Sequence, residues 1–197
     1  MNIAIILGST RPGRLGERVA KFVMQEGSKL DGAKVTLLDL ATYDMPFFNE
    51  LVPPMSNTAR DISPKTQQWL DDIAAADGYV FITPEYNSTF PAVLKNAIDM
   101  LSDQAARKPA GIISYAETMF GGNIAGSQLR LLVNKLGMLP LPKSPALPHA
   151  DTFFDQNGVI VDTSEWAARV KTIIPSFLGE VMWYADALKT ARDKAGS

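Results

Sequence analysis

Cysteine is absent from this chain of 197 residues, and histidine occurs once, as His149. Without cysteine the protein can form no disulfide, thiolate zinc site or iron–sulfur cluster, and it has no cysteine nucleophile. A single histidine also leaves little for a metal centre. The sequence therefore predicts no metal site.

The chain also lacks an excess of either charge and any long apolar run. Its 19 Lys and Arg and 21 Asp and Glu give a net charge of -2, which creates no basic field for nucleic acid or an anionic membrane. No stretch approaches the roughly 18 apolar residues that span a bilayer, and the first residues do not read as a signal peptide. We expect a cytoplasmic protein that binds neither nucleic acid nor membrane.

The composition that remains is that of a folded α/β protein. Hydrophobic residues make up 46% and charged residues 20%, and we expect residues 1–197 to form a single domain. Short runs that are apolar on both faces predict buried parallel strands, separated by enough chain for crossover helices. This pattern favours a three-layer αβα sandwich, flavodoxin-like, with a five-stranded parallel sheet of order 2-1-3-4-5. The predicted strands are 2–7, 34–38, 78–83, 110–114 and, more weakly, 138–141.

Apolar residues at helical spacing predict the crossover helices, as in the face formed by Leu15, Val19 and Phe22. Similar faces start at Leu94 and at Leu129. The last segment, 166–184, carries the same pattern, but Pro175 inside it should kink it or split it in two. The connection 41–64 is long for a compact domain, which is typical of a functional or interfacial loop.

The connection Gly8–Gly16 links the first predicted strand to the first predicted helix. Its glycines permit tight turns, and the unpaired amides and dipole of a helix start favour an anion. Ser9 and Thr10 add hydroxyl donors, while Arg11 and Arg14 add charged ones. We expect a phosphate site here, although a glycine-rich turn with solvated arginines has the same sequence.

Two familiar phosphate motifs do not fit this connection. Gly8 and Gly13 have the spacing of a P-loop, but Arg14 and Leu15 stand where that motif has Lys and Ser or Thr. A dinucleotide turn needs a glycine two residues after Gly8, where this chain has threonine. Asp39, at the end of the second strand, could bind a ribose, but a loop or cap role is the simpler interpretation. A monophosphate is the favoured ligand.

A second connection, 83–99, follows the third predicted strand at the same edge of the sheet. Pro84 stiffens it, and Tyr86 offers a flat face between the polar Glu85 and Asn87. A planar ligand suits this arrangement. An exposed loop tyrosine without a ligand would look the same.

The third connection, 114–123, begins with Ser114 after the fourth predicted strand. Its Gly121-Gly122 pair lets the backbone approach a ligand edge, which Phe120 could cover. Alone it could be a plain strand-to-helix turn. Three such connections at one edge of one sheet indicate a ligand site more strongly than any of them singly.

Together these segments resemble the NADPH-dependent FMN reductase family, which includes flavin, quinone, chromate and azo-dye reductases. The resemblance covers roughly residues 1–145 and is carried by Gly8–Arg14, by the run from Pro84 to Asp99, and by Gly121-Gly122 followed by Gln128-Leu129-Arg130. It implies a flavodoxin-like fold with tightly but non-covalently bound FMN. It also implies NADPH or NADH as co-substrate and a homodimer or homotetramer with the flavin near the interface.

Carried over by position, Ser9 and Arg11 would hold the FMN phosphate, and Tyr86 would lie against the isoalloxazine ring. Many members have Ser at position 14 and Asn at position 16, so Arg14 either replaces a phosphate contact with a charge or points to solvent. No side chain is expected to be catalytic, because the chemistry belongs to N5 of the flavin. The cofactor-binding residues that we expect are Ser9, Arg11, Arg14, Leu15, Gly16, Pro84, Glu85, Tyr86, Asn87, Ser114, Gly121 and Gly122.

The implied reaction is hydride transfer from NAD(P)H to FMN, then to a small-molecule electron acceptor such as a flavin or quinone that takes the vacated place, by a ping-pong mechanism. The pocket above the flavin is expected to draw on Phe47, Phe48 and Phe120. Two alternatives stay open. A flavodoxin-type electron carrier would be expected to present a strongly acidic face, against which the net charge of -2 argues. A flavin-free binding protein could use the same scaffold, since fold does not fix function.

Overall fold

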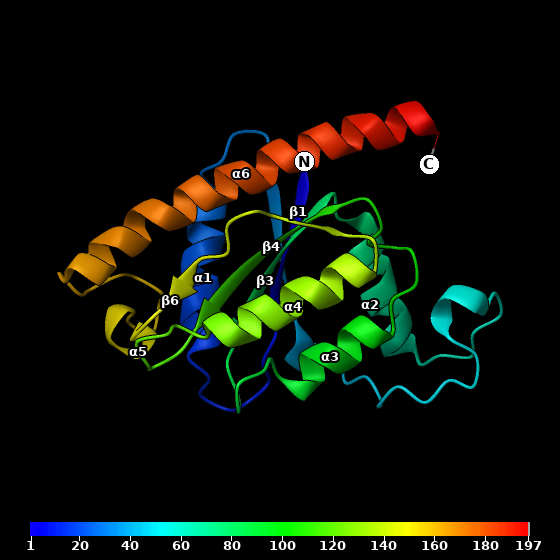
Figure 1. Ribbon diagram of the computed structural model, residues 1–197, viewed down its shortest axis with the longest axis horizontal. Helices are drawn as coiled ribbons and strands as arrows, with labels where there is room; N and C mark the ends of the chain where they lie inside the picture. Colours follow the sequence, from blue (N-terminus) through cyan, green and yellow to red (C-terminus); the bar gives the residue numbers. More distant parts are fainter. Residues whose placement is uncertain (197) are drawn as a thin grey trace.

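The computed structural model describes residues 1–196 and consists of a parallel sheet between two layers of helices (Figure 1). The strands are β1 (Asn2–Leu7), β2 (Lys34–Asp39), β3 (Gly78–Pro84), β4 (Pro109–Tyr115), β5 (Leu139–Pro140) and β6 (Ala146–Leu147). The longer helices are α1 (Gly16–Gly27), α2 (Pro64–Ala75), α3 (Ala92–Asp99), α4 (Asn123–Lys135) and α6 (Glu165–Ala195). The short elements are η1 (Leu40–Thr42), η2 (Pro54–Ser56) and α5 (Ala150–Phe153).

The strand order β2-β1-β3-β4-β5 confirms the flavodoxin-like prediction, with one strand more than expected. All pairings between these six strands are parallel. β5 and β6 both pair with β4, β5 near its start and β6 at its end. β5 pairs at Pro109 and Ala110, whereas β6 pairs at Ser114 and Tyr115. Both β5 and β6 have two residues, but β5 lies within the apolar run 138–141, whereas β6 lies between Pro145 and Pro148 and no apolar run marks it.

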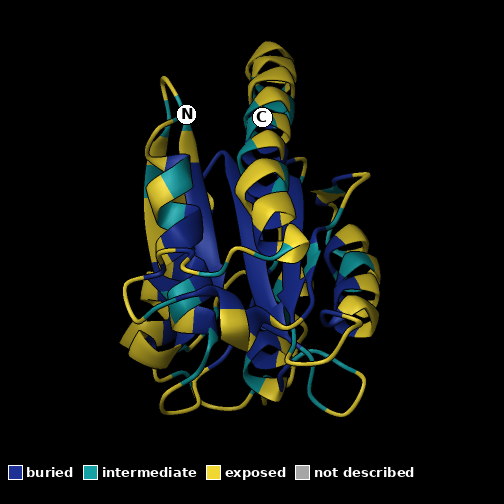
Figure 2. Cartoon of the chain, turned by 90° about the vertical axis from the view of Figure 1, so that its left-hand side faces the viewer, coloured by how far each residue is buried: buried dark blue, intermediate teal, exposed yellow. Residues whose placement is uncertain are grey.

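Two apolar layers hold the helices to the sheet, because the side chains of each strand alternate between its faces. On one face α1 and α6 pack through residues such as Val19 and Val170, and on the other α2, α3 and α4 pack through residues such as Trp69 and Leu94. β3 and β4 are buried throughout. Figure 2 shows these buried strands lying between helices whose outer sides are exposed. The predicted helical faces are therefore the buried ones.

The expectation that Pro175 splits the last helix is wrong. α6 runs without interruption from Glu165 to Ala195, with Pro175 inside it (Figure 1). Pro175 removes one backbone hydrogen bond, but Ile174, Phe177 and Leu178 beside it are buried against the sheet. Tertiary packing of this face stabilises the helix across the proline, because burial contributes more to helix stability than local propensity does.

The long connection after β2 projects from the helical layer near α2 (Figure 1). Asn96 of α3 anchors it, since its side chain accepts a hydrogen bond from Phe48 N (2.8 Å) and donates one to Pro46 O (2.9 Å). Within residues 1–196, no helix combines the length and apolar character required to cross a bilayer.

Candidate functional site

A cavity of about 460 Å³ opens at the edge of the sheet where β1, β3 and β4 end. All three connections singled out in the sequence contribute to it, as expected at the carboxyl ends of parallel strands. The lining residues are Arg11, Pro12, Gly13, Arg14, Leu15, Arg18, Pro84, Glu85, Tyr86, Tyr115, Ala116, Glu117, Thr118 and Asp151.

The turn between β1 and α1 presents unpaired backbone donors. The amides of Thr10, Arg11, Gly13 and Leu15 have no acceptor in the part of the chain that the structure describes, and no side chain caps the start of α1. Gly13 has a φ of +65°, a left-handed conformation that suits glycine and closes the turn. Such amides at a helix N-terminus form a favourable environment for an anion.

Of the two roles that the sequence left open for Arg14, the structure contradicts the one in which it points to solvent. Its side chain is only 6% exposed, and Nη2 lies 2.6 Å from Asp39 Oδ2 at the end of β2. Nη1 donates to the backbone oxygen of Ser9, and Nε lies 3.3 Å from Glu17 Oε1. Arg14 thus connects the β1–α1 turn to the end of β2 through buried contacts.

Arg11 and Tyr86 lie together at the cavity. The guanidinium carbon of Arg11 is 5.5 Å from the centre of the Tyr86 ring, a cation–π distance. Tyr86 is held by a tight hairpin, because its amide and carbonyl both bond to Thr89 while Asn87 and Ser88 have positive φ. Asn87 therefore shapes the turn, as asparagine tolerates this conformation well.

Glu85 joins the second connection to the third. Its Oε2 accepts hydrogen bonds from the amides of Ile124 and Ala125, both at 3.1 Å, at the start of α4. A carboxylate here also complements the helix dipole. Glu85 lines the cavity, and its side chain bonds to the start of α4.

Tyr115 lines the cavity where the sequence predicted its neighbour Ser114. Successive side chains of a strand point to opposite faces, so Tyr115 turns toward α1 while Ser114 packs near Gly126 of α4. The Tyr115 hydroxyl lies 3.3 Å from Ser9 Oγ. Burial raises the pKa of Tyr115 to about 12, although bonds to Ser9 and to the Gly16 amide act in the opposite direction.

Several expected residues are near the cavity without lining it. Gly121 and Gly122 have positive φ and leave no room for a side chain, since an added Cβ would lie 2.8 Å from backbone atoms of Leu147 and of Tyr115 respectively. The expected residues outside the lining are Ser9, Gly16, Asn87, Ser114, Gly121 and Gly122.

Sequence reasoning also missed lining residues. Arg18 of α1 follows Arg14 by four residues. This spacing places the two on one side of a helical turn and could have indicated that Arg18 also lines the cavity. Glu117 and Thr118 belong to the third connection, but no local feature separates them from other polar loop residues. Asp151 comes from α5, beyond the segments that carried the resemblance.

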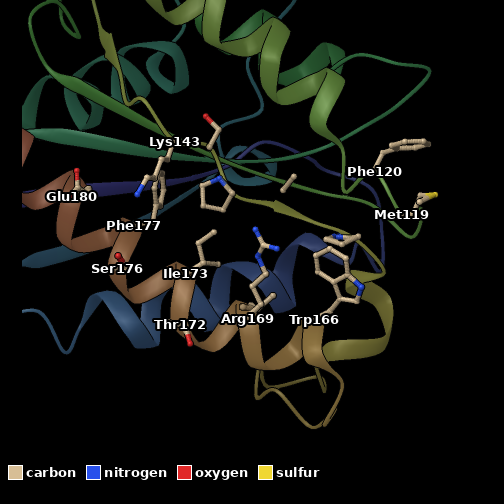
Figure 3. A pocket seen from close by; sticks show the side chains of 15 residues that line it. Met119, Phe120, Lys143, Trp166, Arg169, Thr172, Ile173, Ser176, Phe177 and Glu180 are labelled. Atoms are coloured by element: carbon tan, nitrogen blue, oxygen red, sulfur yellow. The ribbon is translucent and has the colours of Figure 1, made fainter.

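A larger groove of about 780 Å³ lies beside this cavity, between α6 and residues 143–148 (Figure 3). Arg169 lies over the ring of Trp166 at 5.6 Å from its centre, and Phe120 lies at one end. None of the expected cofactor-binding residues lines it. Phe120 was expected above the flavin. It belongs to the third connection and lines this groove instead of the cavity.

Comparison with known proteins decides the family. Residues 1–152 match the model of the family described as NADPH-dependent FMN reductase. The chain belongs to this family. It is 35% identical over 145 residues to the NAD(P)H-dependent FMN reductase C4B3.06c of Schizosaccharomyces pombe, covering 74% of this chain and 72% of that one.

Two further comparisons concern another relative and, for the last one, the fold alone. A quinone reductase of Pseudomonas putida is 28% identical over 169 residues, which cover 82% of this chain and 85% of that protein. The solved structure of FerB, a flavoenzyme NAD(P)H:(acceptor) oxidoreductase from Paracoccus denitrificans, superposes with a TM-score of 0.76 at 22% identity, covering 94% and 97% of the two chains. The expectation of an oxidoreductase that uses FMN and NAD(P)H is confirmed at the level of the family.

Replacing Arg14 by Ala is expected to lower the free energy of unfolding by about 3 kcal/mol, because it leaves Asp39 and the Ser9 carbonyl without their buried partner. Chemical denaturation measures this. Arg11→Ala is the matched control and should change stability by less than about 0.5 kcal/mol, since its contact with Tyr86 lies at the cavity surface. Equal stability of the two variants would contradict the structural role given to Arg14.

Proposed function

We propose that this chain oxidises NAD(P)H with bound FMN and reduces a small planar acceptor, such as a quinone or flavin, by a ping-pong mechanism. One observation carries the proposal: unpaired amides of the β1–α1 turn and the face of Tyr86 border the same cavity. The first suits a phosphate and the second suits a flat ring.

The residues present fit FMN. The amides of Arg11, Gly13 and Leu15 and the Arg11 guanidinium would hold the phosphate, while Pro84 and Tyr86 would border the isoalloxazine. The cavity volume of about 460 Å³ lies within the range of about 300–1,000 Å³ typical of small-molecule sites. When bound, FMN supplies an atom, N5, that can accept and return a hydride.

The protein's part in this reaction is binding and orientation. Arg14 and Asp39 fix the turn, and Glu85 fixes the connection that carries Tyr86. Both walls are thus set by contacts to neighbouring elements before a ligand arrives, which lowers the entropic cost of binding. We infer that NAD(P)H and the electron acceptor bind alternately at one site, because all three connections line the same cavity.

A planar, partly apolar acceptor suits the surroundings of the cavity. Met119 and Phe120 are exposed on the connection that also supplies Glu117 and Thr118 to the lining. The similarity to a quinone reductase supports the same class of acceptor. Exposed apolar side chains beside a binding site favour flat, poorly hydrated molecules.

The test is anaerobic mixing of the FMN-loaded protein with NADPH or NADH in a stopped-flow spectrophotometer. We expect the flavin absorbance near about 450 nm to bleach without any acceptor present and to return when a quinone is added. Double-reciprocal plots of the steady-state rate against NAD(P)H concentration, recorded at several fixed quinone concentrations, should give parallel lines, as a ping-pong mechanism requires. A flavin that does not bleach would contradict the proposed reaction, and intersecting plots would contradict alternation at one place.

We further propose that the chain forms a homodimer or homotetramer through the connection after β2. Leu51, Phe47 and Met55 are 99%, 79% and 72% exposed on this projecting segment. The segment is nevertheless held in shape by Glu50, which receives bonds of 2.6 and 2.9 Å from Arg60. Clustered exposed apolar side chains on an ordered loop are typical of an interface.

Leu51→Glu is expected to shift the assembly toward monomer by at least about tenfold in dissociation constant, since the change places a charge in an apolar contact. Sedimentation equilibrium measures this at micromolar concentrations. Val161→Glu, at another exposed apolar residue, is the control and should leave the assembly unchanged. A wild-type protein that is monomeric under these conditions would contradict the proposal.

A further inference from the structure

Tyr115 reaches the β1–α1 turn from β4 and forms part of the cavity wall. Ser9, which was expected to hold the phosphate, is wholly buried and does not line the cavity. The Ser9 side chain lies behind the Tyr115 hydroxyl, at 3.3 Å from it. Of these two residues, only Tyr115 lines the cavity.

The hydrogen bonds of the pair leave one proton unused. The two hydroxyls bond to each other, with 3.3 Å between their oxygens. Ser9 and Tyr115 together carry two hydroxyl protons, and their mutual bond uses only one. No other acceptor for either hydroxyl occurs in the part of the chain that the structure describes. A buried donor without an acceptor is uncommon, because it loses its bond to water.

The position of the two side chains decides which proton is free. If Tyr115 donated to Ser9, the free proton would lie on a hydroxyl that faces no cavity. If Ser9 donates to Tyr115, the free proton lies on the member of the pair that lines the cavity, near the turn with the unpaired amides. The phenol remains protonated at neutral pH, since burial raises the pKa of Tyr115 to about 12. It can therefore act as a donor to an anion.

Gly16 makes this arrangement sterically possible. A Cβ at position 16 would overlap with the Tyr115 hydroxyl, and it would lie 2.9 Å from Leu7 Cδ1. The space left by the missing side chain at the start of α1 is filled by the phenol of Tyr115. A group from β4 thereby reaches the anion-binding end of the helix.

We propose that Tyr115, rather than Ser9, presents the hydroxyl that binds the FMN phosphate, and that Ser9 is a positioning residue that acts through Tyr115. This inference rests on the proposed function, because it assumes that the phosphate occupies the β1–α1 turn. The phosphate is thereby contacted directly by a side chain of β4, that of Tyr115. The backbone amides and Arg11 remain the other donors.

The experiment compares FMN with riboflavin, which lacks the phosphate, by titrating the flavin-free full-length protein and following flavin fluorescence. Tyr115→Phe should weaken FMN binding by about 10- to 100-fold and leave riboflavin binding within about twofold, because the lost bond is to a charged group. Ser9→Ala should weaken FMN binding by no more than about threefold.

Tyr79→Phe is the matched control, since it also removes a buried phenolic bond, to Ile73 O, at the opposite edge of the sheet. It should leave both affinities unchanged. If Tyr115→Phe does not fold, Gly16→Ala provides the same comparison, because its methyl group should displace the hydroxyl. Selective loss of FMN binding in Gly16→Ala would support the proposal.

Three results would overturn the assignment of Tyr115: unchanged FMN affinity in Tyr115→Phe, an equal loss of FMN and riboflavin binding, or a larger loss in Ser9→Ala than in Tyr115→Phe. Failure of the proposed function would look different. In that case the wild-type protein itself would bind FMN no more tightly than riboflavin.

Discussion

The ion pair between Arg14 and Asp39 is the constraint on which the site depends. It joins the β1–α1 turn to the end of β2, and Arg14 also donates a hydrogen bond to the backbone oxygen of Ser9. These contacts keep the arginine out of solvent, although it also lines the cavity. The amides of the turn are left as the unpaired donors, in a shape that is fixed before anything binds. At the turn itself, these amides and the exposed Arg11 are the donors that can meet an anion.

The same principle extends to the other two connections. Glu85 holds the second connection to the start of α4, and Tyr115 joins the third to the start of α1. Each wall of the cavity is therefore supported by a different element from the one that supplies it. This arrangement suits an enzyme whose cofactor performs the chemistry, because the protein then contributes a rigid binding site and leaves one place for exchanging substrates.

Much of the fold could be predicted from the sequence, because it depends on local periodicity. The run Asn2–Leu7 is apolar on both faces, and short parallel strands with right-handed crossovers permit few orders. β6 was not predicted because its two residues lie between Pro145 and Pro148 and form no apolar run. The sequence left open whether Pro175 kinks or splits the last helix, and α6 is not split because the packing of Phe177 and its neighbours outweighs the effect of the proline.

The site was predictable at the level of its connections but not of its individual contacts. Glycines and unpaired amides after β1 are a local signal, and so is the stiff segment around Tyr86. The role of Arg14 depends on Asp39, 25 residues away, which no local pattern indicates. The choice between Ser114 and Tyr115 depends on which face of β4 meets α1, and this is set by the register of the whole sheet.

The measurement that tests the central claim most directly is the FMN dissociation constant of Arg11→Ala, followed by flavin fluorescence. Arg11 is the exposed cation beside the unpaired amides, so its removal should cost one or two charge-assisted bonds to the phosphate. We expect binding to weaken by about 10- to 1000-fold with the fold intact. An unchanged dissociation constant would place the phosphate elsewhere and contradict the account.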